Sequence, residues 1–258
     1  MIMKKTFVFL VALLFLHGIF VPVQAQEDNE DYAMWETIML TPDNTKLKLL
    51  GENLRKHNQK YHGEGPYNAS IYNIVSGPHT GKMVWIMGPL KFPQLDARPA
   101  EGGHDEDWRD NVMPYLKKTE QGEYWRADNE LSNVGNLSTD PADNPILFTR
   151  YLEVNVEHQH QLNARLKTTS TTIKAMEGEN PWGVYYNLFR QGNKIGRHIA
   201  TVSFYKNWTD FDRDPKFKDT FLKDHNDDDW YAFIRDTDLI LDDSWDEIWV
   251  FDKFMSGK

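Results

Sequence analysis

The sequence predicts an α+β fold made of two tandem β-α-β-β-α-β units. The first observation is a repeat, in which residues 63–81 read GEGPYNASIYNIVSGPHTG and residues 178–196 read GENPWGVYYNLFRQGNKIG, at a constant offset of 115. The second observation is that the same order of strands and helices can be assigned to both halves. The third is that the predicted strands are apolar on both faces, which is typical of sheets that are covered on both sides.

Length and composition agree with two packed halves. The chain has 258 residues, of which 40% are hydrophobic and 13% aromatic, and it contains nine tryptophans. Such a composition is typical of a globular protein rather than a disordered one. The duplication divides the chain into a first unit at residues 26–131, a linker at 132–145 and a second unit at 146–258.

Residues 1–25 have the pattern of a signal peptide. Lys4 and Lys5 precede an apolar run, and small residues lead up to a cleavage position after Ala25. We therefore expect a secreted or periplasmic protein. No later stretch is apolar over a membrane-spanning length, so we expect no membrane association after cleavage. The chain has no cysteine, which excludes disulfides and thiolate ligands.

The charge of the chain argues against polyanionic partners. Its formal net charge is −10, and removal of residues 1–25 takes away two lysines and no acid, which leaves −12. An acidic protein is a poor partner for nucleic acid or anionic lipid. The charge also suffices to keep an exported protein soluble. The sequence leaves the oligomeric state open.

The first half begins with a predicted strand at residues 34–40 and a helix after Thr41-Pro42. Apolar and aromatic residues then follow at steps of three and four, which places them on one helical face: Leu47, Leu50, Leu54, His57 and Tyr61. We expect this helix to pack on the sheet through that face. A lone histidine on such a face is interpreted as a packed residue rather than a ligand.

The rest of the first half contains a hairpin, a loop, a second helix and a fourth strand. The hairpin strands flank the glycine turn at residues 77–81, and acidic residues open the second helix, as its positive end favours. The predicted ranges are 68–76 and 83–90 for the hairpin, 92–103 for the loop, 104–117 for the helix and 123–131 for the strand.

The second half repeats this order, with nine additional residues in its last helical region. Its predicted ranges are a strand at 146–154, a helix with the apolar face Leu162, Leu166, Thr169, Ile173 and Met176, hairpin strands at 182–190 and 197–207, a helix starting at 225–230, and a last strand. In that strand Glu247-Ile248-Trp249 matches Glu123-Tyr124-Trp125 of the first half.

The order of elements is that of a ferredoxin-like unit in tandem. The chain resembles the dimeric α+β barrel superfamily in a single-chain form, through the repeated Gly-Glu-x-Pro-aromatic and Gly-x-x-x-Gly segments, the repeated His…Trp helix openings and the Glu-x-Trp strands. The resemblance covers residues 33–254. It implies two antiparallel sheets packed face to face around a cavity, and functions that include cofactor-independent oxygenases or isomerases and haem enzymes.

A haem site would require an axial ligand, most often histidine. His198, at the start of a central strand, is the candidate that the sequence offers. The alternative interpretation is that this side chain makes a local hydrogen bond. Otherwise we expect no cofactor.

No metal site or catalytic group is assigned from the sequence. Glu153, Glu157, His158 and His160 cluster at a strand-to-helix junction, but their spacing matches no established zinc motif. Residues 225–229 lack the glycine and distal glutamate of a calcium loop. Both segments are interpreted as helix N-termini, and the chain carries no nucleophile elbow, phosphate-binding loop or dinucleotide fingerprint.

The predicted ligand site lies on the strands. Ile248 and Val250 suit the helix-facing side of the last strand, so Trp245, Glu247 and Trp249 should face the cavity, and the repeat extends this to Glu123 and Trp125. The candidate ligand-binding residues are Trp125, Arg150, Tyr186, Asn187, Tyr205, Glu247 and Trp249. The two tryptophans would stack on the ligand, while Arg150 and Glu247 would orient its polar groups.

The sequence therefore predicts an exported barrel that binds a small apolar or aromatic molecule between its sheets. The alternatives are a cofactor-independent monooxygenase or isomerase, a haem-binding barrel, and a structural or interaction module whose aromatic residues simply fill the core. Asn73 and Asn187 sit one position out of register in the repeat, so they should face opposite sides of equivalent strands. Asn68, Asn136 and Asn207 lie in glycosylation sequons, which matter only in a eukaryotic secretory pathway.

Overall fold

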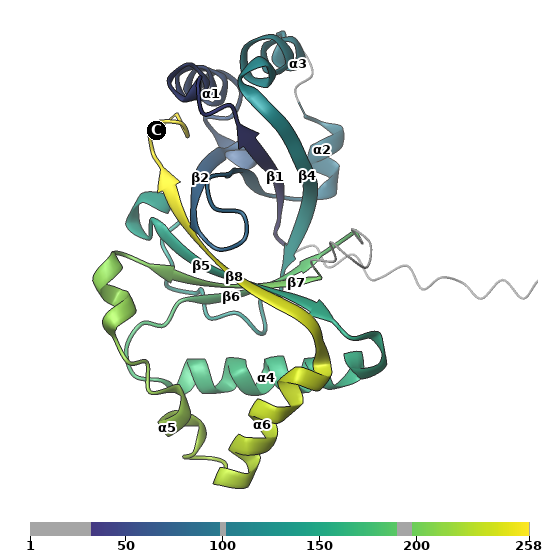
Figure 1. Ribbon diagram of the computed structural model, residues 1–258, viewed down its shortest axis with the longest axis vertical. Coiled ribbons are helices and arrows are strands. Elements are labelled where there is room, and N and C mark those ends of the chain that lie inside the picture. Colours follow the sequence, from purple (N-terminus) through teal and green to yellow (C-terminus); the bar gives the residue numbers. More distant parts are fainter. Residues whose placement is uncertain (1–31, 99–101, 190–197, 258) are drawn as a thin grey trace, which may run out of the picture. The chain divides into compact units, whose positions relative to one another are not determined.

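Eight antiparallel strands form one closed barrel in the computed structural model (Figure 1). The structure describes residues 32–98, 102–189 and 198–257, so the predicted signal peptide lies outside the described residues. The strands are β1 (Met34–Pro42), β2 (Ala69–Ser76), β3 (Met83–Leu90), β4 (Leu116–Ala127), β5 (Ile146–Val154), β6 (Trp182–Asn187), β7 (Ile199–Tyr205) and β8 (Leu241–Asp252).

The order of strands around the barrel identifies two equivalent halves. The first half runs β4-β1-β3-β2 and the second runs β8-β5-β7-β6, which is the same ferredoxin-like order twice. Two antiparallel seams join the halves, since β2 pairs with β8 and β4 pairs with β6. The predicted fold class is confirmed, and the two sheets are continuous with each other because their edge strands pair.

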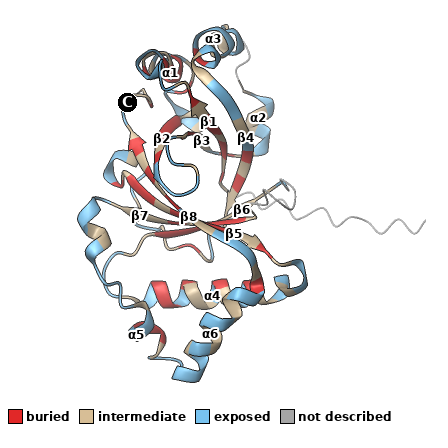
Figure 2. Cartoon of the chain, in the orientation of Figure 1, coloured by how far each residue is buried: buried red, intermediate tan, exposed pale blue. Residues whose placement is uncertain are grey.

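Alternation along the strands gives the barrel an inner and an outer face. The inner face is a cluster of buried apolar and aromatic side chains from both halves, including Met39, Tyr72, Val84, Trp125, Tyr151 and Trp249. The outer face of each half packs under a long helix, α1 (Leu47–Tyr61) in the first half and α4 (Gln159–Ala175) in the second. Buried residues accordingly follow the strands and the inward sides of these helices (Figure 2).

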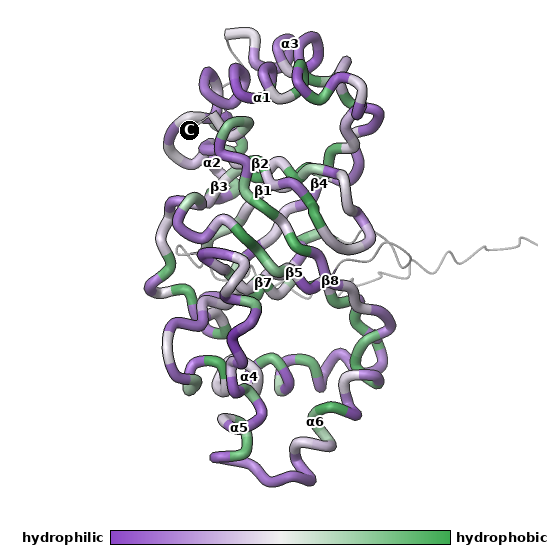
Figure 3. Tube along the Cα trace, turned by 60° about the vertical axis from the view of Figure 1, so that its left-hand side comes forward, coloured by the Kyte–Doolittle hydropathy of each residue, from purple (hydrophilic) through white to green (hydrophobic). Residues whose placement is uncertain are grey.

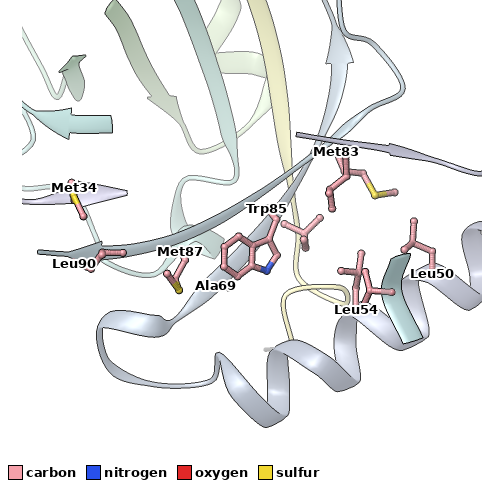
Figure 4. Packing of buried hydrophobic residues seen from close by; sticks show 11 residues of the cluster. Met34, Leu50, Leu54, Ala69, Met83, Trp85, Met87 and Leu90 are labelled. Carbon is pink, nitrogen blue, oxygen red and sulfur yellow. The ribbon is translucent and has the colours of Figure 1, made fainter. Parts of the chain in front are cut away.

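Helix α1 packs on the first half through part of its predicted face. Leu50 and Leu54 are fully buried and lie near Trp85 and Met83 of β3 (Figure 4). Leu47 begins the helix and is 42% exposed, so the packed face starts one turn later than the sequence indicates. Hydrophobic residues otherwise concentrate on the strands, with polar residues along the outer helix surfaces (Figure 3).

Three segments of the first half differ from the sequence prediction. The predicted loop contains a short helix, α2 (Phe92–Asp96). The next helix, α3 (His104–Asp107), continues as a π-helical segment (Trp108–Val112) and a 3₁₀ turn (Met113–Tyr115), where Pro114 has no N–H to continue an α-helix. Strand β4 starts at Leu116, seven residues earlier than predicted, because its first residues extend the pairing with β1.

The second half matches the predicted order closely. Strand β5 has the predicted bounds, while β6 and β7 are shorter than predicted. The glycine turn predicted between them lies in residues 190–197, outside the described residues. The additional residues of this half belong to the region of α5 (Phe217–Phe221) and α6 (Asp227–Ile240). Asn226 and Asp229 form a capping box at the start of α6, as expected of a helix N-terminus.

The segment at residues 132–145 is more than a connection between halves. The Ser132 hydroxyl accepts a hydrogen bond from the backbone N–H of Val184 at 2.9 Å, and the N–H of Asn133 donates to the carbonyl of Trp182 at 2.7 Å. Residues Tyr32–Lys258 form one compact unit. Within the described residues, no helix has the length and hydrophobicity that a membrane crossing requires.

The different burial of two leucines on α1 provides a test of this packing. Leu54→Ala should lower the free energy of unfolding by about 2–5 kcal/mol, because it leaves a cavity between α1 and β3. Leu47→Ala, on the same helix but exposed, should change it by less than about 0.5 kcal/mol. Urea unfolding followed by circular dichroism measures both, and equal effects would contradict the packing described.

Candidate functional site

A cavity of about 500 Å³ lies inside the barrel. Its walls come from both halves and are dominated by aromatic side chains. They include Trp35, Tyr72, Trp125, Tyr151, Tyr185 and Trp249. Because these side chains lie on the inner faces of paired strands, barrel closure itself brings them together.

Tyr151 of β5 connects the aromatic walls of the two halves. Its ring centroid lies 5.8 Å from that of Trp125 in β4 and 6.3 Å from that of Trp249 in β8. Trp245 stacks on it with a centroid distance of 5.4 Å and an interplanar angle of 29°. Such contacts leave these side chains little rotamer freedom, so the aromatic wall of the cavity is held in place.

The segment predicted as a linker also forms part of the cavity wall. Leu137, Asp140 and Asn144 line it, and Asn144 is buried while Asp140 is exposed to solvent. The Asp140 carboxylate accepts a hydrogen bond from the backbone N–H of Ala142 at 2.9 Å, which fixes this short turn. The linker thus covers a space that the strands alone would leave open.

A few polar groups face this apolar space. The Thr149 side chain is 1% exposed and lines the cavity, and its hydroxyl has no hydrogen-bond partner among the described residues. Desolvation raises the pKa of Tyr72 and Tyr185 well above the usual range, so both phenols stay neutral and can donate a proton in a hydrogen bond. A buried hydroxyl without a partner is costly, and a ligand with one polar group would satisfy it.

The repeated Glu-x-Trp segments face inward as predicted, but the glutamates do not line the cavity. Glu247 accepts hydrogen bonds from the indole N–H of Trp249 at 2.8 Å and from Nδ1 of His79 at 2.5 Å. Glu123 accepts from the indole N–H of Trp125 at 3.2 Å. The prediction that Glu247 orients a ligand is wrong in position, because this carboxylate holds Trp249 and His79 instead.

His79 reaches Glu247 because the glycine turn of the first half lies against β8. Gly77 has φ = +104°, and a Cβ there would lie 2.3 Å from the carbonyl oxygen of Asp246. Only glycine allows that close approach. Gly77 is therefore structural, and Gly81 at the end of the turn has φ = +89°, a conformation that also favours glycine.

Three predicted cavity residues lie on the outer face of the barrel. Arg150 points away from the cavity and forms a double hydrogen bond with Asp246 at 2.7 and 2.8 Å. Tyr186 packs with the cluster under α4, and Tyr205 contacts Phe211 outside the barrel. The reason is alternation, since the neighbours of these residues, Thr149, Tyr185 and Phe204, occupy the inner face.

Asn187 and Asn73 face opposite sides, as the register of the repeat predicts. The Asn187 side chain lies on the inner side and donates to Glu123 at 3.4 Å, although Asn187 does not line the cavity. Asn73 donates instead to Asp252 at 3.0 Å, and its neighbours Tyr72 and Ile74 occupy the inner cluster. Of the predicted ligand-binding residues, Trp125 and Trp249 line the cavity.

A second cavity, of about 660 Å³, lies between the outer face of the second half and helices α4, α5 and α6. Arg150, Arg165 and Trp245 are among its lining residues, and the described lining contains no histidine.

His198 does not fit the role of a haem ligand. Its Nδ1 accepts a hydrogen bond from the backbone N–H of Val154 at 3.1 Å, so the neutral ring keeps its proton on Nε2 and has no lone pair there for iron.

A histidine cluster on the outer side of the first half was not predicted from the sequence. His57 is buried, as predicted for a packed residue, but it lies beside His62 and His104, with ring centroids 5.2 and 5.0 Å away. Burial lowers the pKa of His57, and burial, together with the nearby His57, His104 and Arg98, lowers the pKa of His62 to about 3. The sequence does place two histidines, His57 and His62, close together at the end of a helix. It does not show that His104 lies beside them, because only folding brings α3 to the end of α1.

Solved structures share this architecture. A proposed monooxygenase from Fusobacterium nucleatum superimposes with a TM-score of 0.55 and 12% identity, over 85% of this chain and 93% of that one. An anthrone oxidase-like protein superimposes with a TM-score of 0.53 and 11% identity, over 86% of this chain and 92% of that one. A proposed chlorite dismutase superimposes with a TM-score of 0.51 and 6% identity, over 87% of this chain and 98% of that one.

The chain has the dimeric α+β barrel fold. In this α+β barrel both ferredoxin-like halves are supplied by one chain. At such low identities the similarity concerns the fold alone. No protein-family model matches the sequence, and no curated protein sequence matches it either.

Replacing the Thr149 hydroxyl tests whether that group lacks a partner in the protein. Thr149→Val keeps the shape of the side chain and removes the hydroxyl, so it should raise the free energy of unfolding by about 1 kcal/mol. Urea unfolding without added ligand measures this change. A loss of stability would contradict the description, because it would mean that the hydroxyl makes a stabilising hydrogen bond.

Proposed function

We propose that the protein is an exported α+β barrel that binds a small aromatic or largely apolar molecule inside the barrel. The observation that carries the proposal is the aromatic cavity of about 500 Å³ with the buried Thr149 hydroxyl on its wall. This volume lies in the range of small-molecule sites, which are usually apolar with a few placed polar groups.

The chemistry of the walls defines the class of ligand. Trp125, Tyr151 and Trp249 offer flat faces to a planar ring. Thr149 offers one hydrogen bond to a hydroxyl or carbonyl group. Asp140 is the only carboxylate among the described lining residues, and no lysine or arginine accompanies it there, so an uncharged ligand suits the cavity better than an anion.

Export rests on the residue pattern of the N-terminus. Two lysines, an apolar run and small residues before Gln26 support cleavage after Ala25. Sequencing the N-terminus of the protein recovered outside the cytoplasm tests this point, and a mature chain that still begins at Met1 would contradict it.

Binding can be tested with 1-naphthol and 1-methylnaphthalene, which differ mainly in one polar group. Both compounds should quench tryptophan fluorescence and raise Tm, since they would pack against the aromatic walls of the cavity. Ala200→Leu, which adds bulk to the cavity wall, should weaken binding of both compounds about tenfold or more. Trp249→Ala should also weaken binding, whereas Trp208→Ala, at a tryptophan that is 54% exposed, should not.

The polar contact has a test of its own. Thr149→Val should weaken binding of 1-naphthol by about tenfold, the equivalent of one hydrogen bond, and should leave binding of 1-methylnaphthalene nearly unchanged. If neither compound binds the wild-type protein, or if Ala200→Leu and Trp249→Ala bind them as the wild type does, the proposal is wrong.

Catalysis in the same cavity is the second candidate function. It is supported by the descriptions of proteins that share the fold, which include proposed monooxygenases and an anthrone oxidase-like protein. Oxygen consumption with hydroquinone-type compounds tests it. Turnover that Ala200→Leu abolishes and Trp208→Ala preserves would establish an enzyme, and no turnover with a bound compound would leave a binding protein.

A further inference from the structure

Three histidines converge on the outer side of the first half, away from the barrel cavity. His57 lies on α1, His62 follows the last residue of that helix, and His104 begins α3. One ring nitrogen of each lies within 4.8 Å of those of the other two. Helices α1 and α3 lie side by side at this end of the structure (Figure 1), and none of the three residues lines the barrel cavity.

The hydrogen bonds of the cluster determine where the protons are. Nδ1 of His57 lies 2.8 Å from a carboxylate oxygen of Asp107, and Nδ1 of His104 lies 2.7 Å from a carboxylate oxygen of Asp105. Nδ1 of His62 lies 3.0 Å from the carbonyl oxygen of Tyr67. Carbonyl and carboxylate oxygens only accept hydrogen bonds, so each Nδ1 carries a proton and each neutral ring has its lone pair on Nε2.

The Nε2 lone pairs of the three histidines have no hydrogen-bond donor among the described residues. Nε2 of His62 and Nε2 of His104 are 3.0 Å apart. Nε2 of His57 is buried and has no hydrogen-bond partner among the described residues. Facing lone pairs repel each other, and an unpaired buried nitrogen is costly. A cation coordinated by all three nitrogens removes both penalties.

We propose that His57, His62 and His104 bind one divalent transition metal ion, with Zn²⁺ as the best match. Three neutral imidazoles are an established zinc ligand set, with Zn–N distances of about 2.0–2.1 Å. Tetrahedral geometry at that distance places ligand nitrogens roughly 3.3 Å apart, and the His62–His104 separation is already close to this value. The ring nitrogen that His57 contributes lies within 4.8 Å of the other two, so it has to move closer to them to complete the set.

The surroundings of the three rings are those of a metal centre. Each ring donates its other N–H to a carboxylate or carbonyl oxygen, which is the outer-shell arrangement that orients metal-bound histidines. Trp85 packs edge-on against His62 at 5.0 Å, and Trp108 against His57 at 5.1 Å. These indole contacts restrict the orientations of the two histidine rings.

One coordination position remains accessible. A cavity of about 130 Å³ borders His62 and His104, and Lys60 and Arg98 are also among its lining residues. Nε of Arg98 is buried without a hydrogen-bond partner among the described residues, while another nitrogen of its guanidinium contacts Glu36. The fourth ligand is therefore water or a small anion, held on one side by the metal and on the other by these cationic side chains.

The repeat shows that the fold does not require these histidines. The positions offset by 115 from His57 and His62 hold Thr172 and Glu177. Thr172 donates its hydroxyl hydrogen to the carbonyl of Thr168 at 2.9 Å, within its own helix. The second half thus forms an equivalent helix without the cluster.

Metal binding can be measured with Co²⁺ and Zn²⁺ on the full mature chain after dialysis against a chelator. Co²⁺ should produce the intense visible absorption of a four-coordinate site at one ion per chain, and Zn²⁺ should displace it. His104→Ala should abolish this absorption and lower the affinity for Zn²⁺, measured by calorimetry, by at least about 100-fold. His160→Ala, which removes an exposed histidine of the second half, should change neither measurement.

A conservative variant distinguishes metal binding from a role in folding. Asp107→Asn should lower the affinity for Zn²⁺ by about 10- to 100-fold, because the oxygen that orients His57 loses its charge. Circular dichroism checks that each variant is folded. The proposal is overturned if the wild-type chain gives no four-coordinate Co²⁺ spectrum, or if His104→Ala and Asp107→Asn bind Zn²⁺ as tightly as His160→Ala does.

Discussion

Closure of the sheet is the constraint on which the rest of this structure depends. Each half ends in edge strands whose backbone groups need partners, and the pairs β2–β8 and β4–β6 provide them. Because both seams are made within one chain, the inner faces of the two halves are forced to face each other. The space between them is then enclosed by strand side chains and by the segment at residues 132–145.

The two halves keep the same strand order and have diverged on their outer faces. The first half carries a short α3 and the histidine cluster, and the second carries α5, a longer α6 and a large outer cavity. On the inner face the copies remain alike, since each places a glutamate beneath a tryptophan of its last strand. The two halves of the α+β barrel are therefore alike on the inner face and differ on the outer face.

Periodicity and the internal repeat were sufficient to predict the fold. They located β5 to the residue, the inward side of Trp125 and Trp249, and the opposite orientations of Asn73 and Asn187. They failed where a pattern has two solutions. Strands that are apolar on both faces do not reveal which side is inside, so Arg150, Tyr186 and Tyr205 were placed in the cavity although alternation turns them outward.

Two further features depend on contacts between distant residues. His62 and His104 are 42 positions apart, and only the packing of α3 against the end of α1 brings their rings together. A histidine viewed alone, such as His57, therefore suggested core packing. The polar composition of residues 132–145 likewise indicated a linker, and their role as a cavity wall comes from the return of this segment across the barrel.

The most direct measurement of the central claim is a crystal structure of the mature chain soaked with 1-naphthol. We expect electron density for the naphthyl ring in the barrel cavity, against Trp125, Tyr151 and Trp249, with its hydroxyl within hydrogen-bond distance of Thr149. A barrel interior filled by rearranged side chains, with the compound bound only in the outer cavity under α4 and α6, would contradict it.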